Sequence, residues 1–453
     1  MSEQDARDRL ASLANSGRPE EAEALARALL REQPQDAQLE NALCLSLMGQ
    51  MEFSQALLSA QRGIELTKDD FFGRHSFLRE FVVCCAQLGQ IEMGREMARA
   101  YLASYGTSHG SDRAWAGIFL WMLGLTQEAL ANYEAALAEL PGDSYLTYQV
   151  GLARMCLGDR QGMAQYRSYV SREFWARYYP DPNADFSRMW EGESLEGKSI
   201  LVRPHGGVGD CIQFIRYARI LREMGAREVV LALPSERIRG LFQSVPDVRI
   251  GSVDEIHSTD CWTSIFGLCC NLFLEHGALP TQQYLTAPPS RLADAQLALI
   301  RKRAAGRRCI AIAWHSDMSD GSLRSVPLGT LLPLFGLPNV HWVITQRGVA
   351  LRQFMRSGLN AQCSVLAETS TFDDTGALFA GLDGVVTIDS YSLHMAGAQG
   401  VPTWFLAGRS LDWRHFNEET RSEWYPSVRL VRQPAMGDWR SAVEDLRQQL
   451  LAL

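Results

Sequence analysis

The 453-residue sequence lacks three features that would each indicate a particular class of protein. None of its 10 cysteines forms a CxxC pair, so no metal cluster is indicated and we expect reduced, buried thiols. The formal net charge is −8, which excludes the strongly basic surface typical of nucleic-acid-binding proteins. No apolar run approaches the length of a membrane span, and the charged N-terminus has no apolar signal segment. We therefore expect a cytoplasmic protein without a metal, a nucleic-acid partner or a membrane span.

The first third of the chain carries glycine turns at nearly regular intervals. They lie 32 to 40 residues apart, at Gly17, Gly49, Gly89, Gly124 and Gly158. Apolar residues between the turns recur at helical spacing, and Pro34 and Pro141 fall near the ends of units, where a helix must stop. A period of about 34 residues with two helices per unit is typical of tetratricopeptide repeats. Residues 1–167 are therefore predicted to form tetratricopeptide-like helical repeats.

Stacked repeats of this kind form a solenoid with a concave groove. Such a groove usually holds a peptide or a partner protein, and we expect an acceptor protein there. The alternative is that the helices only form a dimer surface or support the second half, which leaves a homo-oligomer open. Residues 168–197 follow as a linker that is rich in aromatics and contains Pro180 and Pro182. The prolines argue against a continuing helix, so we expect the linker to pack across the joint between the repeats and the second half of the chain.

From residue 199 onward, apolar runs of strand length alternate with helical patterns. The predicted strands are 200–202, 229–233, 309–313, 342–345, 385–388 and 403–406, and the clearest predicted helices are 210–224, 290–303 and 391–399. Alternation of this kind implies parallel sheets covered by helices. We expect two Rossmann-like domains, residues 198–288 and 289–453, with a cleft at the carboxyl ends of their strands.

A glycine-rich turn follows the first predicted strand. Gly206, Gly207 and Gly209 precede a helical pattern that begins at Asp210. Exposed backbone N–H groups and the positive end of a helix dipole suit an anion such as a nucleotide diphosphate. The Asp210 carboxylate would repel a phosphate bound there, which indicates chemistry in addition to binding.

A second strand-to-helix turn follows residues 385–388. Asp389 and Ser390 end the strand, and Ser390 or Ser392 can cap the helix that follows. Hydroxyls and free N–H groups form a second edge suited to phosphate. The sequence thus predicts one such turn in each Rossmann-like domain.

Several motifs occur in order along the second half: SILVRPHGGVGDCIQFIRY, IAIAWHSD, WVITQRG, DSYSLHMAGAQGVPTWFL, DWRHF and SEWYPSVRLVRQP. Together with the repeats they resemble the bacterial tetratricopeptide-repeat glycosyltransferases. Those proteins are similar to the heptosyltransferases of family 9 and the O-linked N-acetylglucosamine transferases of family 41. The resemblance covers nearly the whole chain. It implies an α plus α/β architecture: a solenoid, then a GT-B pair of Rossmann-like domains with the acceptor side first and the donor side second.

The resemblance also implies an activity. The chain would be an inverting, metal-independent glycosyltransferase with no cofactor, using a nucleotide-sugar as co-substrate. The sugar would pass to a hydroxyl of a protein held by the repeats, with flagellin or another surface protein as the kind of acceptor implied. Two alternatives stay open: a saccharide or lipopolysaccharide heptosyltransferase-like enzyme, and a catalytically degenerate protein-binding scaffold.

The candidate catalytic residues lie in the glycine turn. Asp210 matches the acidic residue after the glycine turn of heptosyltransferase-like enzymes and is the candidate general base; its position alone indicates an N-cap. His205 is the alternative base. His394, one turn into the second helix, either donates to a phosphate or hydrogen-bonds within the joint, and the resemblance favours the first.

The donor-side candidates surround the expected cleft. Arg324 and Arg347 supply positive charge for the leaving phosphate. Trp314 either stacks on a base or packs in the core, and Gln346 reads a nucleobase edge. The donor-binding set is Gly206, Gly207, Trp314, His315, Arg324, Gln346, Arg347, Asp389, Ser390, Tyr391, Ser392 and His394.

Three departures from the family pattern bear on the identity of the donor. Arg203, Pro204 and His205 stand where an acidic residue and Gln are common. Arg347 stands where Lys is common, which keeps the charge but changes its geometry. The loop 317–323 lacks the basic residues often found there.

Overall fold

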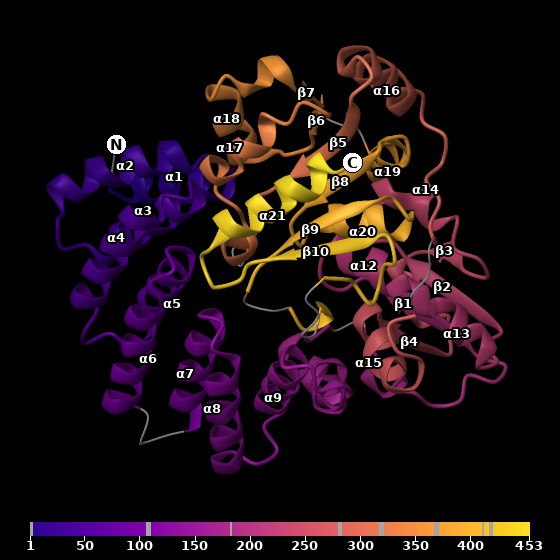
Figure 1. Ribbon diagram of the computed structural model, residues 1–453. Helices are drawn as coiled ribbons and strands as arrows, with labels where there is room; N and C mark the ends of the chain where they lie inside the picture. The colour runs from indigo at the N-terminus through magenta and orange to yellow at the C-terminus, as the bar shows by residue number, and fades with distance from the viewer. Residues whose placement is uncertain are drawn as a thin grey trace.

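The computed structural model describes residues 3–105, 110–181, 184–279, 283–316, 321–366, 371–409, 412–415 and 420–453. Within these ranges a curved array of helices, indigo to purple in Figure 1, bends round one side of two α/β domains. The expected fold class, a tetratricopeptide-like solenoid followed by a GT-B pair of Rossmann-like domains, is confirmed. No helix in the described ranges has both the length and the apolar character needed to cross a membrane.

Helices α1 to α9 form the solenoid and pair as hairpins in chain order. Their bounds are α1 Glu3–Asn15, α2 Pro19–Glu32, α3 Ala37–Gly49, α4 Phe53–Leu66, α5 Phe71–Gln87, α6 Ile91–Tyr105, α7 Gly110–Met122, α8 Thr126–Glu139 and α9 Ser144–Cys156. The first helices of successive hairpins, α1, α3, α5 and α7, contact one another more extensively than the second helices do. They therefore form the inner, concave layer of the array.

Small residues and polar caps define the solenoid hairpins locally. A Cβ at Gly63 would lie 2.1 Å from the Phe77 ring, so the helices approach too closely there for any side chain. The Asp36 carboxylate accepts hydrogen bonds from backbone N–H groups at the start of α3, and Asp143 does the same for α9. These caps fix where the first helix of a hairpin begins.

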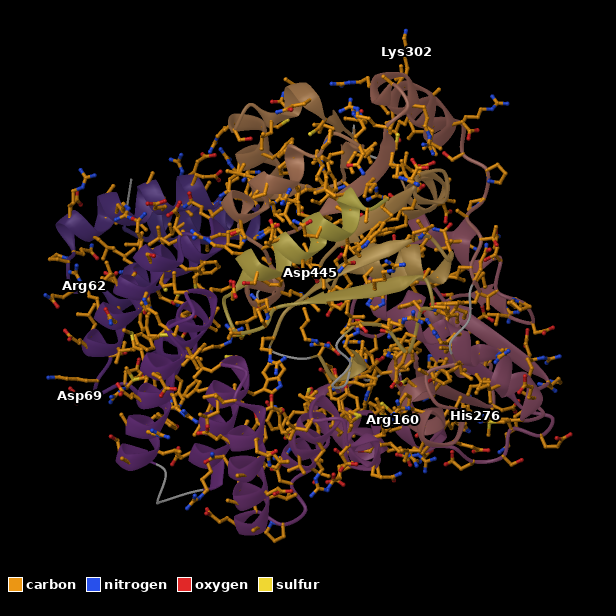
Figure 2. The ribbon with its side chains drawn as sticks, viewed as in Figure 1. Arg62, Asp69, Arg160, His276, Lys302 and Asp445 are labelled. Atoms are coloured by element: carbon orange, nitrogen blue, oxygen red, sulfur yellow. The ribbon has the colours of Figure 1, made fainter. Side chains whose placement is uncertain are left out.

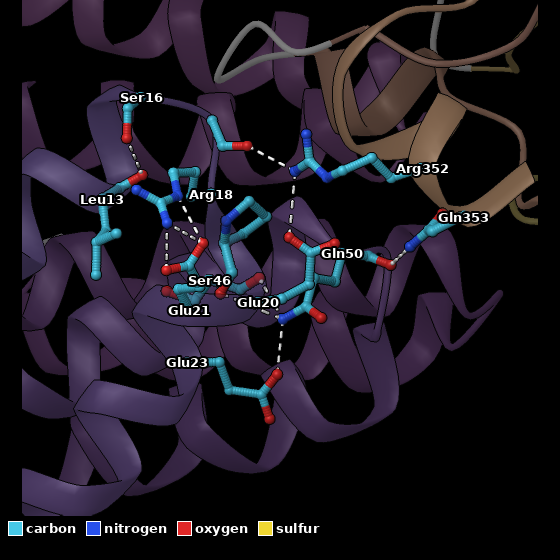
Figure 3. A network of polar contacts seen from close by, with 12 residues as sticks. Leu13, Ser16, Arg18, Glu20, Glu21, Glu23, Ser46, Gln50, Arg352 and Gln353 are labelled. Atoms are coloured by element: carbon cyan, nitrogen blue, oxygen red, sulfur yellow. Dashed lines mark hydrogen bonds and ion pairs between the residues drawn. The ribbon is translucent and has the colours of Figure 1, made fainter. Parts of the chain in front are cut away.

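The turns inside the hairpins meet the second α/β domain along one edge, which we call the docking edge. Helix α18 (Gly348–Arg356) supplies its N-terminal contacts. Arg352 donates to the Gly17 carbonyl at 2.7 Å, and Gln353 donates to the Gln50 carbonyl at 2.9 Å (Figure 3). Two successive turns are thereby held by one helix of the other half.

The docking edge continues toward the C-terminal end of the solenoid. A Cβ at Gly437 would lie 2.6 Å from the backbone nitrogen of Gly89, so these two segments of the backbone are in contact. Met436 packs against the solenoid core. At the last turn Arg160 forms an ion pair with Glu423 (Figure 2). The solenoid is therefore fixed to the second α/β domain at several points.

Short helices carry the chain from the solenoid to the first sheet. They are η1 Arg160–Gly162, α10 Met163–Tyr166, η2 Arg167–Val170, α11 Arg172–Tyr178 and η3 Phe186–Arg188. Phe174 and Trp175 of α11 are buried against Leu201 and Trp262 of the first α/β domain. The linker packs across the joint, as predicted, and α11 ends before Pro180.

The first α/β domain is built on a parallel sheet in the order β3-β2-β1-β4. Its strands are β1 Ser199–Arg203, β2 Glu228–Ala232, β3 Arg249–Gly251 and β4 Cys261–Ser264. Its helices are α12 Val208–Phe214, η4 Ile215–Tyr217, α13 Ala218–Glu223, η5 Glu236–Ile238, α14 Arg239–Phe242, η6 Val253–His257 and α15 Ile265–His276. Strand β1 lies inside the sheet, so the turn that follows it opens at the middle of the sheet edge.

The second α/β domain is built on a parallel sheet in the order β10-β9-β8-β5-β6-β7. Its strands are β5 Arg308–Ala313, β6 Val340–Ile344, β7 Ser364–Val365, β8 Gly384–Thr387, β9 Thr403–Ala407 and β10 Val428–Arg432. Besides α18, its helices are α16 Arg291–Ala304, η7 Gly321–Arg324, α17 Leu328–Phe335, η8 Leu359–Gln362, α19 Phe372–Ala380, α20 Tyr391–Ala398, η9 Trp413–His415 and α21 Trp439–Leu451. Strands β6, β8 and β9 are buried along their whole length, which is typical of a parallel sheet covered on both faces.

Polar contacts join the two α/β domains. Asp373 of α19 accepts from the N–H groups of Gly240 and Leu241 at 2.8 and 2.7 Å. From the first domain, Arg216 donates to the Trp424 carbonyl at 2.8 Å. The relative position of the two sheets is therefore set by specific bonds as well as by apolar packing.

The predicted helix 210–224 is wrong in its extent. Helix α12 begins two residues earlier, and the 3-10 turn η4 separates it from α13. Arg216 lies within this break and bonds to its own turn, through the Gln213 carbonyl, and to Trp424 across the joint. The helix is thus interrupted where Arg216 makes a long-range contact, and local periodicity cannot predict such a contact.

Candidate active site

The two predicted turns lie directly against each other. We call residues 206–210 the first turn and residues 389–394 the second turn; they follow β1 and β8 and open α12 and α20. A Cβ at Gly209 would lie 2.8 Å from the His394 ring, so no side chain fits between the turns. The parallel topology brings the ends of two inner strands to one point, as expected for two facing sheets.

The first turn is closed by the Asp210 carboxylate. Gly206 has φ +74°, a conformation that glycine adopts without strain. One Asp210 oxygen accepts from the Gly207 N–H at 2.7 Å. Gly207 is the N-cap of α12 and Asp210 is its third helical residue, so the N-cap predicted for Asp210 is wrong and its carboxylate caps the helix from within. The other oxygen forms an ion pair with Arg414 of the second domain. The carboxylate of the candidate base is thus held by residues of both α/β domains.

Arg414 is a buried cation in η9. Its guanidinium also pairs with Asp412 and lies over the rings of Phe214 and Phe266, with Cζ 5.5 and 5.6 Å from their centroids. Burial opposes its charge, but the surrounding carboxylates, Asp412 first, outweigh burial and raise the pKa of Arg414 further. The positive charge therefore persists in a largely apolar setting.

The second turn holds a buried charge network. The His394 Nδ1 lies 2.9 Å from the Tyr425 hydroxyl, and its Nε2 lies 3.6 Å from an Asp389 oxygen. Arg324 lies 3.5 Å from the other Asp389 oxygen. Burial alone would raise the pKa of Asp389, but His394 and Arg324 outweigh it and hold the pKa well below its usual range. The second turn thus carries a fixed carboxylate that orients a histidine and an arginine.

Ser390 is the residue that caps α20. Its hydroxyl accepts from the Ser392 N–H at 3.3 Å and lies 3.2 Å from the Thr387 hydroxyl. Tyr391 packs edge-on against Phe372, with ring centroids 5.3 Å apart. Of the two serines that the sequence left open, the first therefore performs the capping, and Ser392 is buried.

His205 lies among aromatic rings beside the first turn. It stacks on Tyr169 at 5.4 Å, and the rings of Trp175 and Tyr179 contact it edge-on. Burial lowers the pKa of His205 to about 4, against an opposing effect of Asp210. The ring is therefore neutral near neutral pH, and its Nε2 lies 3.2 Å from the Tyr169 hydroxyl.

Gln346 is engaged with the backbone at the end of β5. Its Oε1 accepts from the N–H groups of Trp314 and His315 at 2.9 and 3.0 Å, and its Nε2 donates to the carbonyls of His315 and Arg347. Trp314 is buried and packs against Phe354. A contact of either side chain with a nucleobase would require these arrangements to change, and their donor roles stay predictions.

The remaining candidates lie around the same edge. Arg347 is exposed at the start of α18. Residues 317–320 of the loop 317–323 lie outside the described residues. Among the residues that the structure describes, no group of three or more His, Cys, Asp or Glu side chains could hold a metal ion. Cys211, beside the first turn, is buried, and burial raises its pKa to about 12, so it is a poor nucleophile.

Sequence reasoning missed three residues of this site: Asp412, Arg414 and Tyr425. The available signals were the DWRHF and SEWYPSVRLVRQP motifs, which contain all three. Neither motif indicates by itself that its residues contact the two turns, because those contacts cross some 30 to 200 positions of sequence.

The arrangement places a carboxylate and an anion-stabilising turn together. The Asp210 side chain is 20% exposed, so one end of it is accessible to a hydroxyl group. The neighbouring second turn holds the N-terminus of α20, His394 and, through Asp389, Arg324, which can stabilise developing negative charge. Together these groups can remove a proton on one side and stabilise an anionic leaving group on the other.

Comparison with known proteins gives one curated relative and several solved structures. No protein-family model matches the chain. Protein FlbA of Caulobacter vibrioides is 25% identical over 359 residues, which cover 71% of this chain. The alignment spans 59% of the length of that relative.

Solved structures are similar to each half of the chain separately. A family 9 glycosyl transferase from Veillonella parvula is 12% identical, with a TM-score of 0.42, over 58% of this chain and 99% of its own. The ADP-heptose heptosyltransferase II of E. coli is 15% identical, with a TM-score of 0.38, over 56% and 99%. A Podospora anserina protein with TPR-like repeats is 14% identical, with a TM-score of 0.32, over 39% and 96%.

Proposed function

We propose that this chain is an inverting, metal-independent glycosyltransferase. It moves a sugar from a nucleotide-sugar donor to a hydroxyl of a protein acceptor held by the solenoid. The observation that carries the proposal is the direct contact of the first and second turns, with Gly209 against His394. That contact joins a solvent-accessible carboxylate to a buried turn suited to a diphosphate.

In this proposal each turn has one task. Asp210 takes the proton from the acceptor hydroxyl, which then attacks the sugar carbon as the bond to the leaving phosphate breaks. His394, Arg324 and the positive end of the α20 dipole stabilise the negative charge that develops on the leaving diphosphate. The reaction needs no metal in this scheme because these groups supply the positive charge.

A nucleotide-sugar screen tests the donor side. UDP-, GDP-, ADP- and CMP-sugars are added to the full chain, and the melting temperature is followed. A ligand that binds only the folded state must raise it, by an amount that grows with its concentration relative to Kd. We expect one nucleotide class to do so. No response to any of them would favour a non-catalytic protein-binding scaffold.

Aromatic rings support the idea of a protein acceptor, because they run without a break from the solenoid to the first turn. Tyr148 of α9 stacks on Tyr169 at 4.9 Å, and Tyr169 stacks on His205. Tyr179, which is 43% exposed, contacts the same histidine. A segment of acceptor leaving the solenoid would meet these rings before reaching Asp210.

Substitution of Tyr179 tests the acceptor side. Tyr179→Ala is expected to raise KM for a protein acceptor, with flagellin and other surface proteins tried first, and to leave hydrolysis of the donor unchanged. Leu299→Ala is the matched control, because Leu299 is 66% exposed on α16. Equal effects on protein transfer and on hydrolysis would contradict an acceptor role and favour a saccharide or lipid-linked acceptor.

A further inference from the structure

Arg414 is placed in a way that ordinary packing does not require. It is buried among Phe214, Phe266 and Trp413, with its Cζ 5.5, 5.6 and 5.5 Å from their centroids. A charged group in such a setting is costly unless it is paired. Its partners are two carboxylates, Asp412 of its own segment and Asp210 of the other domain.

A second buried arginine provides an internal comparison. Arg216 also crosses the joint, but its bonds go to the carbonyls of Ala278, Leu279 and Trp424 and to the Tyr284 hydroxyl. Among the described residues, it joins the domains without contacting a carboxylate. Since Arg216 and the Asp373 contacts already link the two domains, the bond from Arg414 to a carboxylate is additional to that linkage.

The two anchors of Asp210 define the orientation of its carboxylate. One oxygen accepts from the Gly207 N–H and the other is held by Arg414, so the carboxyl group cannot rotate freely. Each carboxylate oxygen has a second lone pair, so both anchors can be kept while a proton is accepted. The charged or titratable groups around this carboxylate are Arg414, Asp412, His205, Tyr169 and Cys211. Arg414 is the permanent cation of that set.

We propose that Arg414 is a positioning residue, which reaches from the second α/β domain to orient the Asp210 carboxylate. The inference rests on the proposed function, in which Asp210 is the general base. Arg414 touches neither the sugar nor the diphosphate in this assignment. The donor-side domain thus contributes directly to base catalysis on the acceptor side, and the two domains must be assembled for the base to be competent.

Amide hydrogen exchange tests the geometry without any ligand. In the full-length Arg414→Gln variant, exchange of the Gly207 amide is expected to rise at least tenfold, because the carboxylate that accepts from it is no longer held. The amides of Gly240 and Leu241, which Asp373 holds at another point of the same joint, should be unchanged. Equal increases at all three would make Arg414 a general clamp and overturn the assignment, as would no change at Gly207.

Kinetics test the consequence. The nucleotide-sugar that gives the largest thermal stabilisation is the probe, and its hydrolysis is followed for the wild type, Arg414→Gln and Arg414→Lys. We expect Arg414→Gln to lower kcat about 100-fold and to leave donor Kd within threefold. Arg414→Lys, which keeps the charge but not the planar geometry of the guanidinium, should restore part of the rate.

The outcomes separate this inference from the proposed function. A wild type that binds no nucleotide-sugar contradicts the proposed function, whatever the variants do. A wild type that turns over, together with an Arg414→Gln variant of undiminished kcat, contradicts only the positioning role. A variant that loses donor affinity but keeps kcat at saturation would make Arg414 a phosphate ligand and overturn the proposal. Loss of rate with no rescue by Lys would leave only a structural role and would also overturn it.

Discussion

The first and second turns each follow an inner strand of a parallel sheet, but they differ in the residues that they contain. Gly206 and Gly207 of the first turn are exposed, and its one charged side chain, Asp210, is accessible to solvent. In the second turn Asp389 and His394 are buried and are held by Arg324 and Tyr425. Accessibility suits a group that must meet a variable hydroxyl, whereas a fixed, dry network suits stabilisation of charge in a transition state. The two turns thus differ in exposure in the way that the proposed function requires.

Removal of the first-turn carboxylate should have the largest effect. Asp210→Ala is expected to lower transfer about 1000-fold, since a positioned general base contributes 100- to 10,000-fold. Stabilisation of the folded chain by the nucleotide-sugar should remain, because the proposed function assigns donor binding to the second turn. Transfer is measured with labelled donor, and full activity in the variant would remove Asp210 from the site.

Removal of the second-turn histidine should affect both binding and rate. His394→Ala is expected to lower kcat about 100-fold and to weaken donor binding, because it removes a buried donor beside Asp389. Tyr425→Phe is the matched control, since it deletes only the hydroxyl that lies 2.9 Å from the His394 Nδ1. It should cost tenfold or less. If the control is as damaging as His394→Ala, orientation by Tyr425 matters more than the histidine itself.

The contact between the turns can be tested with two alanines. A Cβ at Gly209 would meet the His394 ring at 2.8 Å, whereas one at Gly207 would have no neighbour closer than 3.5 Å. Gly209→Ala should therefore reduce the free energy of unfolding by about 1–3 kcal/mol and lower the rate. Gly207→Ala should leave the unfolding free energy nearly unchanged. Urea unfolding checks both, and equal behaviour would mean that the turns are not in contact in solution.

The smallest effect concerns His205 and is seen only with pH. Burial lowers its pKa to about 4, below the ordinary value of about 6.5. Below pH 6.5 the unfolded chain takes up the proton first, so stability falls as pH drops from 6.5 toward 4, by about 2 kcal/mol between pH 7 and 5.

Substitution by phenylalanine isolates that contribution. His205→Phe keeps an aromatic ring but cannot titrate, so its loss of stability between pH 7 and 5 should be smaller than that of the wild type. His257→Phe is the control, because it removes an imidazole that is exposed on the surface. Urea midpoints at the two pH values provide the measurement. An unchanged slope in His205→Phe would show that the aromatic surroundings of His205 are open in solution.

Local patterns predicted most of the architecture. Repeated turns are visible as glycines because a left-handed residue is needed where each hairpin reverses, and Gly17, Gly89 and Gly124 all have positive φ. The second unit differs, since Met51 takes the left-handed conformation in place of Gly49. The sequence therefore predicts the repeat period and the pairing of the helices. It does not predict, in every unit, which residue takes the left-handed conformation at the turn.

Strands without an apolar run escaped prediction. Strand β4 reads CWTS and β10 reads VRLVR, where arginines alternate with apolar residues, and β3 and β7 are very short. Their pairing to β1, β9, β2 and β6 comes from the sheet, not from their own sequence. Strands whose apolar side chains are buried on both faces carry the stronger signal.

The sequence predicted the two turns of the candidate site but not the residues that contact and orient them. Asp210, Ser390 and His394 follow glycine or serine signals beside a strand, so the sequence reveals them. Arg414 and Tyr425 reach the turns from loops that have no period. Gln346 illustrates the reverse case, because a polar residue at a strand end was expected to face a ligand and instead bonds the backbone.

The docking edge has a consequence for how such a chain can change over evolutionary time. Arrays of repeats commonly grow or shrink by whole units, because each unit contacts only its neighbours. Here Gly17 and Gln50 are bonded to α18, while Gly89 and Gly124 lie against residues 436–437. A unit gained or lost between α3 and α9 would move the earlier turns out of register with these partners. The second α/β domain therefore restricts the number of repeats that the chain can carry.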